Sequence, residues 1–192
     1  MNQYLSIFIK SMLVDNVVLI QYLAICPFIG MTSDTGKATG MGIATTFVII
    51  LATAVTYPIY YGIMVPLKLE FLETLIFILV IAALVQLVEF YLKKSIPGLY
   101  SAMGVYLALI TTNCAVLGTT LLCISKNYNY IQSLVYSAGT ACGFLLALVI
   151  MSGVRERMRS STVPKFIQGK PILFITAGLL SLSFLGFSGL IK

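Results

Sequence analysis

Residues 42–64 read GIATTFVIILATAVTYPIYYGIM and contain no Asp, Glu, Lys or Arg. An α-helix of about 20 residues crosses the roughly 30 Å hydrocarbon core of a bilayer, so this stretch is long enough to span a membrane. Lipid leaves the backbone amides no hydrogen-bond partners except within a helix or a closed barrel, and the stretch lacks the period-two alternation of barrel strands. It therefore predicts a transmembrane helix.

Similar apolar stretches recur along the chain and predict an all-α integral membrane protein with six transmembrane helices. Their expected ranges are Tyr4–Gly30, Gly42–Met64, Leu72–Leu92, Tyr100–Ile124, Ile131–Val154 and Pro171–Ile191. The connections are short, apart from the basic segment Arg155–Lys170, so we expect a single membrane domain, 1–192, that forms one bundle. The N-terminus lacks the basic region and small-residue cleavage site of a signal peptide, so the first span is expected in the mature protein.

The composition excludes a soluble globular protein. Of the 192 residues, 59% are hydrophobic and 9% are charged, and the mean hydropathy is +1.03. Soluble domains carry about a quarter charged residues. A soluble fold of this chain would therefore have too little polar surface to face water.

Positive charge is distributed unevenly over the predicted loops. The first, third and fifth loops hold Lys37, Lys93, Lys94, Arg155, Arg157, Arg159, Lys165 and Lys170, whereas the second and fourth hold only Lys68 and Lys126. Because basic loops are retained in the cytoplasm, the odd loops should be cytoplasmic and both termini should lie outside. This bias accounts for the net charge of +6 without a nucleic-acid partner. A secondary interpretation of the basic fifth loop is that it docks acidic lipid or an acidic soluble partner.

The first and fourth spans contain polar residues that predict helices broken near mid-membrane. These residues are Lys10, Asp15, Asn16, Gln21 and Pro27 in the first span, and Thr111, Thr112, Asn113 and Cys114, followed by Gly118, in the fourth. Each of these spans would begin a three-helix repeat, approximately 1–95 and 96–192. An odd number of helices forces two repeats into opposite orientations, and inverted repeats place their functional site near the membrane midplane.

A comparison of the two broken spans supports the repeat. Setting DNVVLIQYLAICPFIG (Asp15–Gly30) over MGVYLALITTNCAVLG (Met103–Gly118) matches Val17 with Val105, Leu19 with Leu107, Cys26 with Cys114 and Gly30 with Gly118. Apolar segments match easily, so the shared Cys-x-x-x-Gly pattern is the informative part. Each glycine would let another backbone or a cofactor approach the helix closely.

The four cysteines fall into two groups. Cys123 and Cys142 are expected to pack as small hydrophobic residues, the ordinary role of a thiol in a membrane helix. Cys26 and Cys114 occupy equivalent positions in the two halves. Besides inert packing or a disulfide, they are therefore candidates for a metal or redox site.

The chain has no histidine, which removes the commonest alternative ligand for zinc, copper or haem. Four Cys thiolates are the standard ligand set of an iron–sulfur cluster. On a continuous helix Cys123 would lie about 13 Å from Cys114, too far for both to hold one small cluster. The economical model places two thiolates on this chain and two on a homologous neighbour.

Two segments, LVDNVVLIQYLAICPFIG (Leu13–Gly30) and LITTNCAVLGTTLL (Leu109–Leu122), together with the six-span layout, resemble the membrane subunits of the Rnf complexes. These complexes are membrane-bound ferredoxin:NAD+ oxidoreductases that pump ions. The resemblance covers essentially the whole chain and favours the A-type membrane protein of Rnf. The E-type proteins of Rnf and of the Na+-translocating NADH:quinone oxidoreductase are similar paralogues, and the latter is the alternative assignment.

The resemblance implies pairing with a homologous six-helix subunit as an inverted, pseudo-twofold heterodimer, with a [2Fe-2S] cluster between them at mid-membrane. Each subunit would supply two ligands, here Cys26 and Cys114. Electrons from ferredoxin would enter through cytoplasmic iron–sulfur subunits, cross to flavin-carrying subunits, and return to NAD+ at an NADH-binding subunit. This transfer would drive Na+ or H+ outward across a bacterial or archaeal cell membrane. The chain would be one subunit of this translocase and not catalytic alone.

Other polar and small residues are candidates for supporting roles. Thr111, Thr112 and Asn113 could donate hydrogen bonds to the cluster sulfurs, with ordinary helix–helix hydrogen bonding as the alternative. Gly30 and Gly118 would lie beside the cluster. Asp15 is a candidate for an ion path or for the cap of a half-helix.

Two functions of other classes stay open. A small inverted-repeat secondary transporter would also show broken helices, but it would need midplane ligands for a substrate. A structural anchor would need none of these features.

The charge bias predicts that the C-terminus faces outward. In a Lys192→Cys variant, a membrane-impermeant maleimide added to intact cells should label position 192 above the background given by the native thiols of the parent chain. A Lys165→Cys variant should be labelled only after the cells are opened. Labelling of position 192 only from the inside would contradict this orientation.

Overall fold

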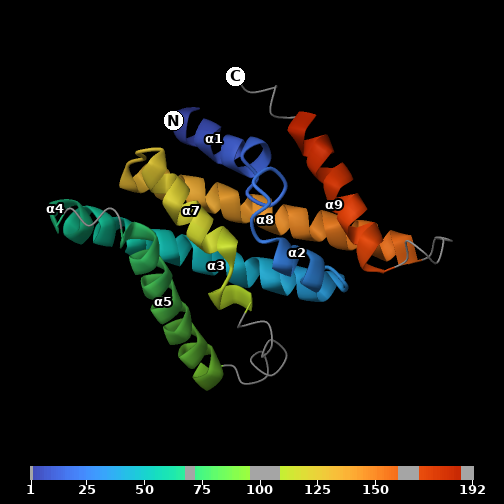
Figure 1. Cartoon of the computed structure of the whole chain (residues 1–192), viewed down its shortest axis with the longest axis horizontal. Coiled ribbons are helices and arrows are strands. Elements are labelled where there is room, and N and C mark those ends of the chain that lie inside the picture. The colour runs from blue at the N-terminus through green and yellow to red at the C-terminus, as the bar shows by residue number, and fades with distance from the viewer. Residues whose placement is uncertain (1, 68–71, 96–108, 160–168, 187–192) are drawn as a thin grey trace.

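A computed structural model of the chain describes residues 2–67, 72–95, 109–159 and 169–186 (Figure 1). The regular structure of this part is helical, which confirms the all-α prediction. The elements are α1 (Asn2–Ile9), the π-helix η1 (Lys10–Val14), α2 (Ile25–Met31), α3 (Thr35–Ile59), the π-helix η2 (Tyr60–Met64), α4 (Val65–Leu67), α5 (Glu73–Ser95), α7 (Cys114–Ser125), α8 (Tyr130–Arg159) and α9 (Lys170–Leu185). Residues 100–108 of the predicted fourth span, 160–168 of the fifth loop and 187–191 of the last span lie outside the described residues.

Three of the described helices are long and apolar enough to cross a membrane. They cover Thr35–Met64, Glu73–Phe90 and Tyr130–Arg159. Shorter apolar helices cover Gln3–Val14, Leu109–Ser125 and Pro171–Leu185. Each of the six predicted spans thus contains helix, while the number of membrane crossings stays a prediction.

The helix of the second predicted span begins earlier than the span itself. α3 begins at Thr35 rather than Gly42, because Asp34 caps it: the Oδ1 atom of Asp34 accepts a hydrogen bond from the backbone N–H of Gly36 at 3.1 Å. The first connection is therefore a short turn, residues 32–34, and Lys37 lies in the first turn of α3 rather than in a loop.

The helix of the fifth predicted span also extends beyond the span. α8 continues to Arg159 instead of ending at Val154, so Arg155, Arg157 and Arg159 lie on this helix rather than in the fifth loop. Basic side chains near a helix C-terminus interact favourably with its unpaired carbonyl groups, which helps the helix to extend through this basic segment.

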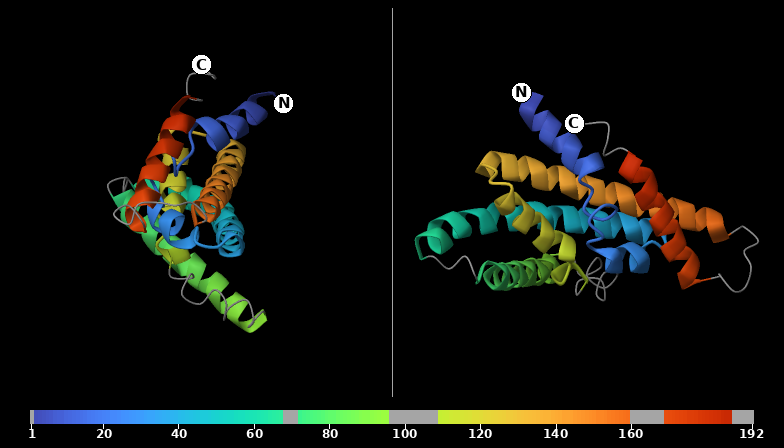
Figure 2. Two further views of the ribbon diagram at one scale, coloured as in Figure 1. Left: turned by 90° about the vertical axis from the view of Figure 1, so that its right-hand side faces the viewer. Right: turned by 45° about the horizontal axis from the view of Figure 1, so that its top comes forward.

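α3 and α8 form the centre of the bundle and run antiparallel, side by side in Figures 1 and 2. From one end to the other, their contacts pair Thr35 with Glu156, Thr46 with Ala141, and Tyr57 with Tyr130. Gly42 brings the helices close, since a Cβ atom there would lie 3.1 Å from Cγ of Leu145. Buried threonine hydroxyls on α3 donate to carbonyls four residues earlier, so packing leaves them satisfied.

The helical segment made of α1 and η1 packs on α8 at two glycines of α8. At Gly139 a Cβ atom would overlap the side chain of Ser11, and at Gly143 it would lie 2.7 Å from the backbone carbonyl oxygen of Met12. Small residues four positions apart let membrane helices approach this closely. In the sequence this contact corresponds to the two glycines of GTACG (139–143). No helix contact was predicted there from the sequence.

Replacing Gly143 by Ala should lower the stability, because the added methyl group would overlap the carbonyl of Met12, and overpacking typically costs about 1–3 kcal/mol. The matched control is Gly153→Ala on the same helix, where a Cβ atom meets nothing within 4 Å. Alanine is the better helix former, so this control should be neutral or stabilising. Thermal unfolding in detergent should give a lower Tm for Gly143→Ala only. Equal Tm values for the two variants would contradict the packing role.

Candidate functional site

The helix expected for the first span is interrupted between Val14 and Ile25. After η1 the backbone leaves the helix, and Tyr22 and Ala24 adopt left-handed conformations with φ angles of 55° and 61°. Residues other than glycine adopt such angles rarely, and where they do the surrounding structure enforces the strain, often at functional sites. An interruption was predicted in this span from its polar residues.

A second, shorter interruption precedes α7. Residues 109–111 are helical, Thr112 and Asn113 are not, and α7 begins at Cys114. Asn113 is extended and caps α7, because its Oδ1 atom accepts a hydrogen bond from the backbone N–H of Ala115 at 3.0 Å. This interruption also lies where the polar residues predicted it.

The two interruptions give Cys26 and Cys114 equivalent places. Cys26 lies in the first turn of α2 and Cys114 is the first residue of α7, so each thiol lies where a helix restarts after an interruption. Both thiols are free and exposed. The first-turn amides of a helix have no partners within the helix and can donate to an anion held there.

The glycines that follow the two cysteines have different surroundings. Gly118 lies against Leu23, whose Cδ2 atom would be 2.6 Å from a Cβ atom at position 118. The last residues of the first interruption therefore pack on α7. Gly30 has open space around it and, like Cys26, is exposed. Residues four apart share a helix face, so α2 presents Cys26 and Gly30 on a face that the described part of the chain leaves uncovered.

The candidate donors next to Cys114 differ in exposure. Thr111 is half-buried and Thr112 is exposed. The backbone carbonyl of Thr112 accepts a hydrogen bond from the Cys114 thiol at 4.0 Å. Asn113 is buried, and its Nδ2 atom has no hydrogen-bond partner among the described residues. Donation to cluster sulfurs by these residues stays a prediction.

Asn16 lies at the start of the first interruption and is completely buried. Its Nδ2 atom donates to the backbone carbonyl of Gly143 on α8 at 3.0 Å. Its Oδ1 atom accepts hydrogen bonds from the backbone N–H groups of Val18 at 3.1 Å and Leu19 at 3.4 Å. Asn16 therefore satisfies backbone groups that the interruption leaves without helical partners.

Asp15 forms an ion pair with Lys126, with 2.7 Å between Oδ2 and Nζ. Burial lowers the pKa of Lys126, but the hydrogen bond to Asp15 and the electrostatic interactions with Tyr136, Asp15 and Tyr128 raise it by more, so the net shift of this pKa is upward. The pair joins the start of the first interruption to the turn between α7 and α8. The predicted role of Asp15 in an ion path stays a prediction. The structure adds that the Asp15 carboxylate is paired with Lys126.

The remaining two thiols are less exposed than Cys26 and Cys114. Cys123 is buried and donates to the backbone carbonyl of Ser133 at 3.8 Å, and Cys142 is partly buried. Among the described residues, no three His, Cys, Asp or Glu side chains lie together in a way that could hold a metal ion. This part of the chain therefore offers Cys26 and Cys114 as exposed thiols but no complete metal site.

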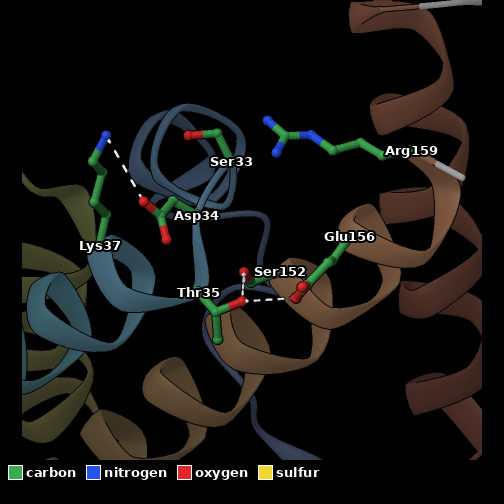
Figure 3. Close-up of a pocket in the computed structure, with 7 residues that line it drawn as sticks. All are labelled: Ser33, Asp34, Thr35, Lys37, Ser152, Glu156 and Arg159. Carbon is green, nitrogen blue, oxygen red and sulfur yellow. Dashed lines mark hydrogen bonds and ion pairs between the residues drawn. The ribbon is translucent and has the colours of Figure 1, made fainter.

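A polar pocket of about 470 Å³ opens where the turn before α3 meets the end of α8 (Figure 3). Its lining residues are Ser33, Asp34, Thr35, Lys37, Ser152, Glu156 and Arg159. The Thr35 hydroxyl donates to Glu156 at 3.2 Å and accepts from Ser152 at 3.1 Å. Acidic and basic side chains are balanced, and neither Cys26 nor Cys114 lines the pocket, so it is separate from the thiol site.

Comparison with known proteins places the chain among membrane subunits. The sequence pattern of a family described as "Rnf-Nqr subunit, membrane protein" matches residues 4–191. The chain belongs to the Rnf-Nqr family. This match covers nearly the whole chain. It confirms the resemblance stated for the segments Leu13–Gly30 and Leu109–Leu122 and the membrane location predicted from the composition.

Several relatives of this Rnf-Nqr chain have names that describe a complex. A protein of Acetobacterium woodii, named as the A-type component of a Na(+)-translocating ferredoxin:NAD(+) oxidoreductase complex, is 53% identical over 184 residues, which cover 96% of each chain. Proteins named as the A-type components of ion-translocating oxidoreductase complexes are 49% identical over 191 residues in Syntrophotalea carbinolica and 48% identical over 192 residues in Aeromonas hydrophila. These alignments cover 100% of this chain, and 99% and 100% of the relatives. The predicted likeness to the A-type membrane protein of Rnf is thereby confirmed.

Proposed function

We propose that the chain is the A-type membrane subunit of an ion-translocating ferredoxin:NAD+ oxidoreductase and carries electrons across the bilayer through a [2Fe-2S] cluster shared with a homologous six-helix subunit. The observation that carries this proposal is the placement of two free, exposed thiols, Cys26 and Cys114, where two helices begin after interruptions. The names of the full-length relatives support membership of such a complex.

The donor set fits half of such a cluster. Four thiolates complete an iron–sulfur site. The described part of this chain offers two exposed thiols, and no group of three His, Cys, Asp or Glu side chains there could hold a metal ion by itself. The described part of the chain leaves the surface around Cys26 and Gly30 open, so a second subunit could bring its own thiols there. When bound, the cluster would take up and pass on one electron at a time.

The N-termini of helices offset part of the negative charge of a cluster held by four thiolates. Charge inside lipid is costly unless fixed dipoles or partners balance it. α7 is 12 residues long and directs the partial positive charge of its N-terminus toward Cys114. Asn113 fixes this first turn by capping it. The chain thus holds the Cys114 sulfur where a negative charge is stabilised.

The packing supports the inverted-repeat topology. α3 and α8 follow α2 and α7 in the two proposed repeats, and they pack antiparallel at the centre of the bundle, as elements related by a twofold axis in the membrane plane would. The turn before α3 meets the end of α8. This contact supports placing the first and fifth connections on one side of the membrane, which the charge bias makes the cytoplasmic side.

The proposed place of the chain in the complex follows from this orientation. Iron–sulfur subunits on the cytoplasmic side would supply electrons from ferredoxin, and flavin-carrying subunits would receive them on the outer side before their return to NAD+. The complex would use the released free energy to export Na+ or H+. The chain's own share is to hold and orient the thiolates.

Cys26→Ala or Cys114→Ala should abolish the [2Fe-2S] EPR signal of the assembled complex and its electron transfer from ferredoxin to NAD+, because each variant lacks one cluster ligand. Cys123→Ala and Cys142→Ala are the matched controls and should preserve the signal, the iron content and the rate. A Cys26→Ala, Cys114→Ala double variant that kept the [2Fe-2S] EPR signal, the full iron content of the parent complex and the original rate would overturn the proposal.

Asn113→Leu should weaken binding of the cluster or shift its reduction potential, because the variant loses the cap that fixes the first turn of α7, a loss that typically costs about 1 kcal/mol. Asn113→Ser keeps an oxygen that can cap the helix and should recover most of the parental behaviour. Redox titration followed by EPR measures both variants. An unchanged spectrum and potential in Asn113→Leu would count against this role.

A further inference from the structure

Arg155 reaches from α8 to the end of the helix that carries Cys26. Its Nη1 atom donates to the backbone carbonyl of Ile29 at 3.0 Å and to the hydroxyl of Thr32 at 3.3 Å. Thr32 is buried and itself donates to the carbonyl of Phe28 at 2.8 Å. The guanidinium group therefore contacts both the last turn of α2 and the residue that ends this helix.

α2 depends on such an external contact because it is short. It has seven residues, and its N-terminal boundary residue, Ala24, provides no side-chain cap. A helix of this length is not stable by itself and takes its stability from tertiary contacts. α7, by contrast, has 12 residues and the Asn113 cap. The two helices that present the thiols are thus held differently: α7 at its N-terminal end by its own cap, and α2 at its C-terminal end by Arg155.

An arginine suits this position. The last carbonyls of a helix have no partners within the helix, and a cation next to them interacts favourably with the helix dipole. The planar guanidinium group can hold a carbonyl and a hydroxyl together in a fixed geometry, whereas a lysine ammonium is a flexible point charge. Cys26 precedes Ile29 by about one helical turn, so a shift of α2 at Ile29 would move the thiol with it.

We infer that Arg155 is a positioning residue for Cys26: by fixing the C-terminal end of α2 against α8, it sets where the Cys26 thiolate meets the cluster. This inference rests on the proposed function, because it concerns the geometry of a cluster ligand. Arg155 supplies no ligand itself. Its loss should therefore disturb the site without removing a thiolate.

The test uses the assembled complex with Arg155→Met, which loses the donors, and Arg155→Lys, which keeps the charge. Arg155→Met should alter the EPR line shape of the [2Fe-2S] cluster and shift its reduction potential. It should also weaken binding of the cluster at least about tenfold, measured as loss of this EPR signal to a chelator, because loss of the hydrogen bonds that orient a ligand typically costs about 10–100-fold in metal affinity. The reduction potential and the cluster retention of Arg155→Lys should lie between those of Arg155→Met and of the parent. The matched control is Arg159→Met on the same helix, where Arg159 lines the polar pocket (Figure 3); it should behave as the parent.

A Thr32→Val variant removes one acceptor of the guanidinium group at nearly constant side-chain volume and should shift the same quantities by less. Parental values in Arg155→Met, or equal changes in Arg159→Met, would overturn the inference. If Arg155→Met does not assemble, Thr32→Val decides, and parental values there would overturn it as well. Retention of the cluster by Cys26→Ala, which has no ligand atom at this position, would instead defeat the proposed function. Loss of the cluster in Cys26→Ala together with parental behaviour of Arg155→Met would defeat the positioning role alone.

Discussion

A helix inside lipid can be interrupted only where the freed backbone groups find other partners, because no water is present to bind them. Asn16 meets this requirement at the first interruption by accepting from two backbone N–H groups and donating to the carbonyl of Gly143. Ser181 of α9 adds a hydrogen bond to the carbonyl of Leu19 at 2.6 Å. These side chains replace helical hydrogen bonds and join the interruption to α8 and α9. The position of α2, and of Cys26 at its start, depends on them.

The close approach of η1 to α8 also helps to stabilise the first interruption. A Cβ atom at position 143 would lie 3.1 Å from Nδ2 of Asn16 and 2.7 Å from the carbonyl oxygen of Met12. A glycine there thus serves both the helix packing and the hydrogen bond that stabilises the interruption. At the second interruption the stabilising contact is local, because Asn113 caps the helix that follows it directly in the chain. The two halves therefore share the places of their cysteines but not the contacts that hold them.

Features that depend on neighbours in the chain could be predicted from the sequence. Apolar runs predicted the helices, and the polar residues within them predicted both interruptions. The start of α3 at Thr35 was not predicted because TGKATGM (35–41) has the composition of a loop, and only the Asp34 cap and the packing on α8 make it helical. Contacts between distant residues, such as Asp15 with Lys126, leave no local pattern. Arg155 was interpreted only as a loop charge for the same reason, because nothing near it in the sequence indicates Ile29 as a partner.

A site shared between two chains makes two opposite demands on each half. The thiols must be open to the partner, and they must be fixed before the partner arrives, since ordering a helix during association would cost binding free energy. The exposed face of Cys26 and Gly30 meets the first demand. Asn113 and Arg155 meet the second, because the contacts that they make to α7 and α2 lie wholly within this chain. Under the proposed function, therefore, each thiolate would be presented by a helix whose position this chain has already set, and the partner subunit would need to supply only its own ligands.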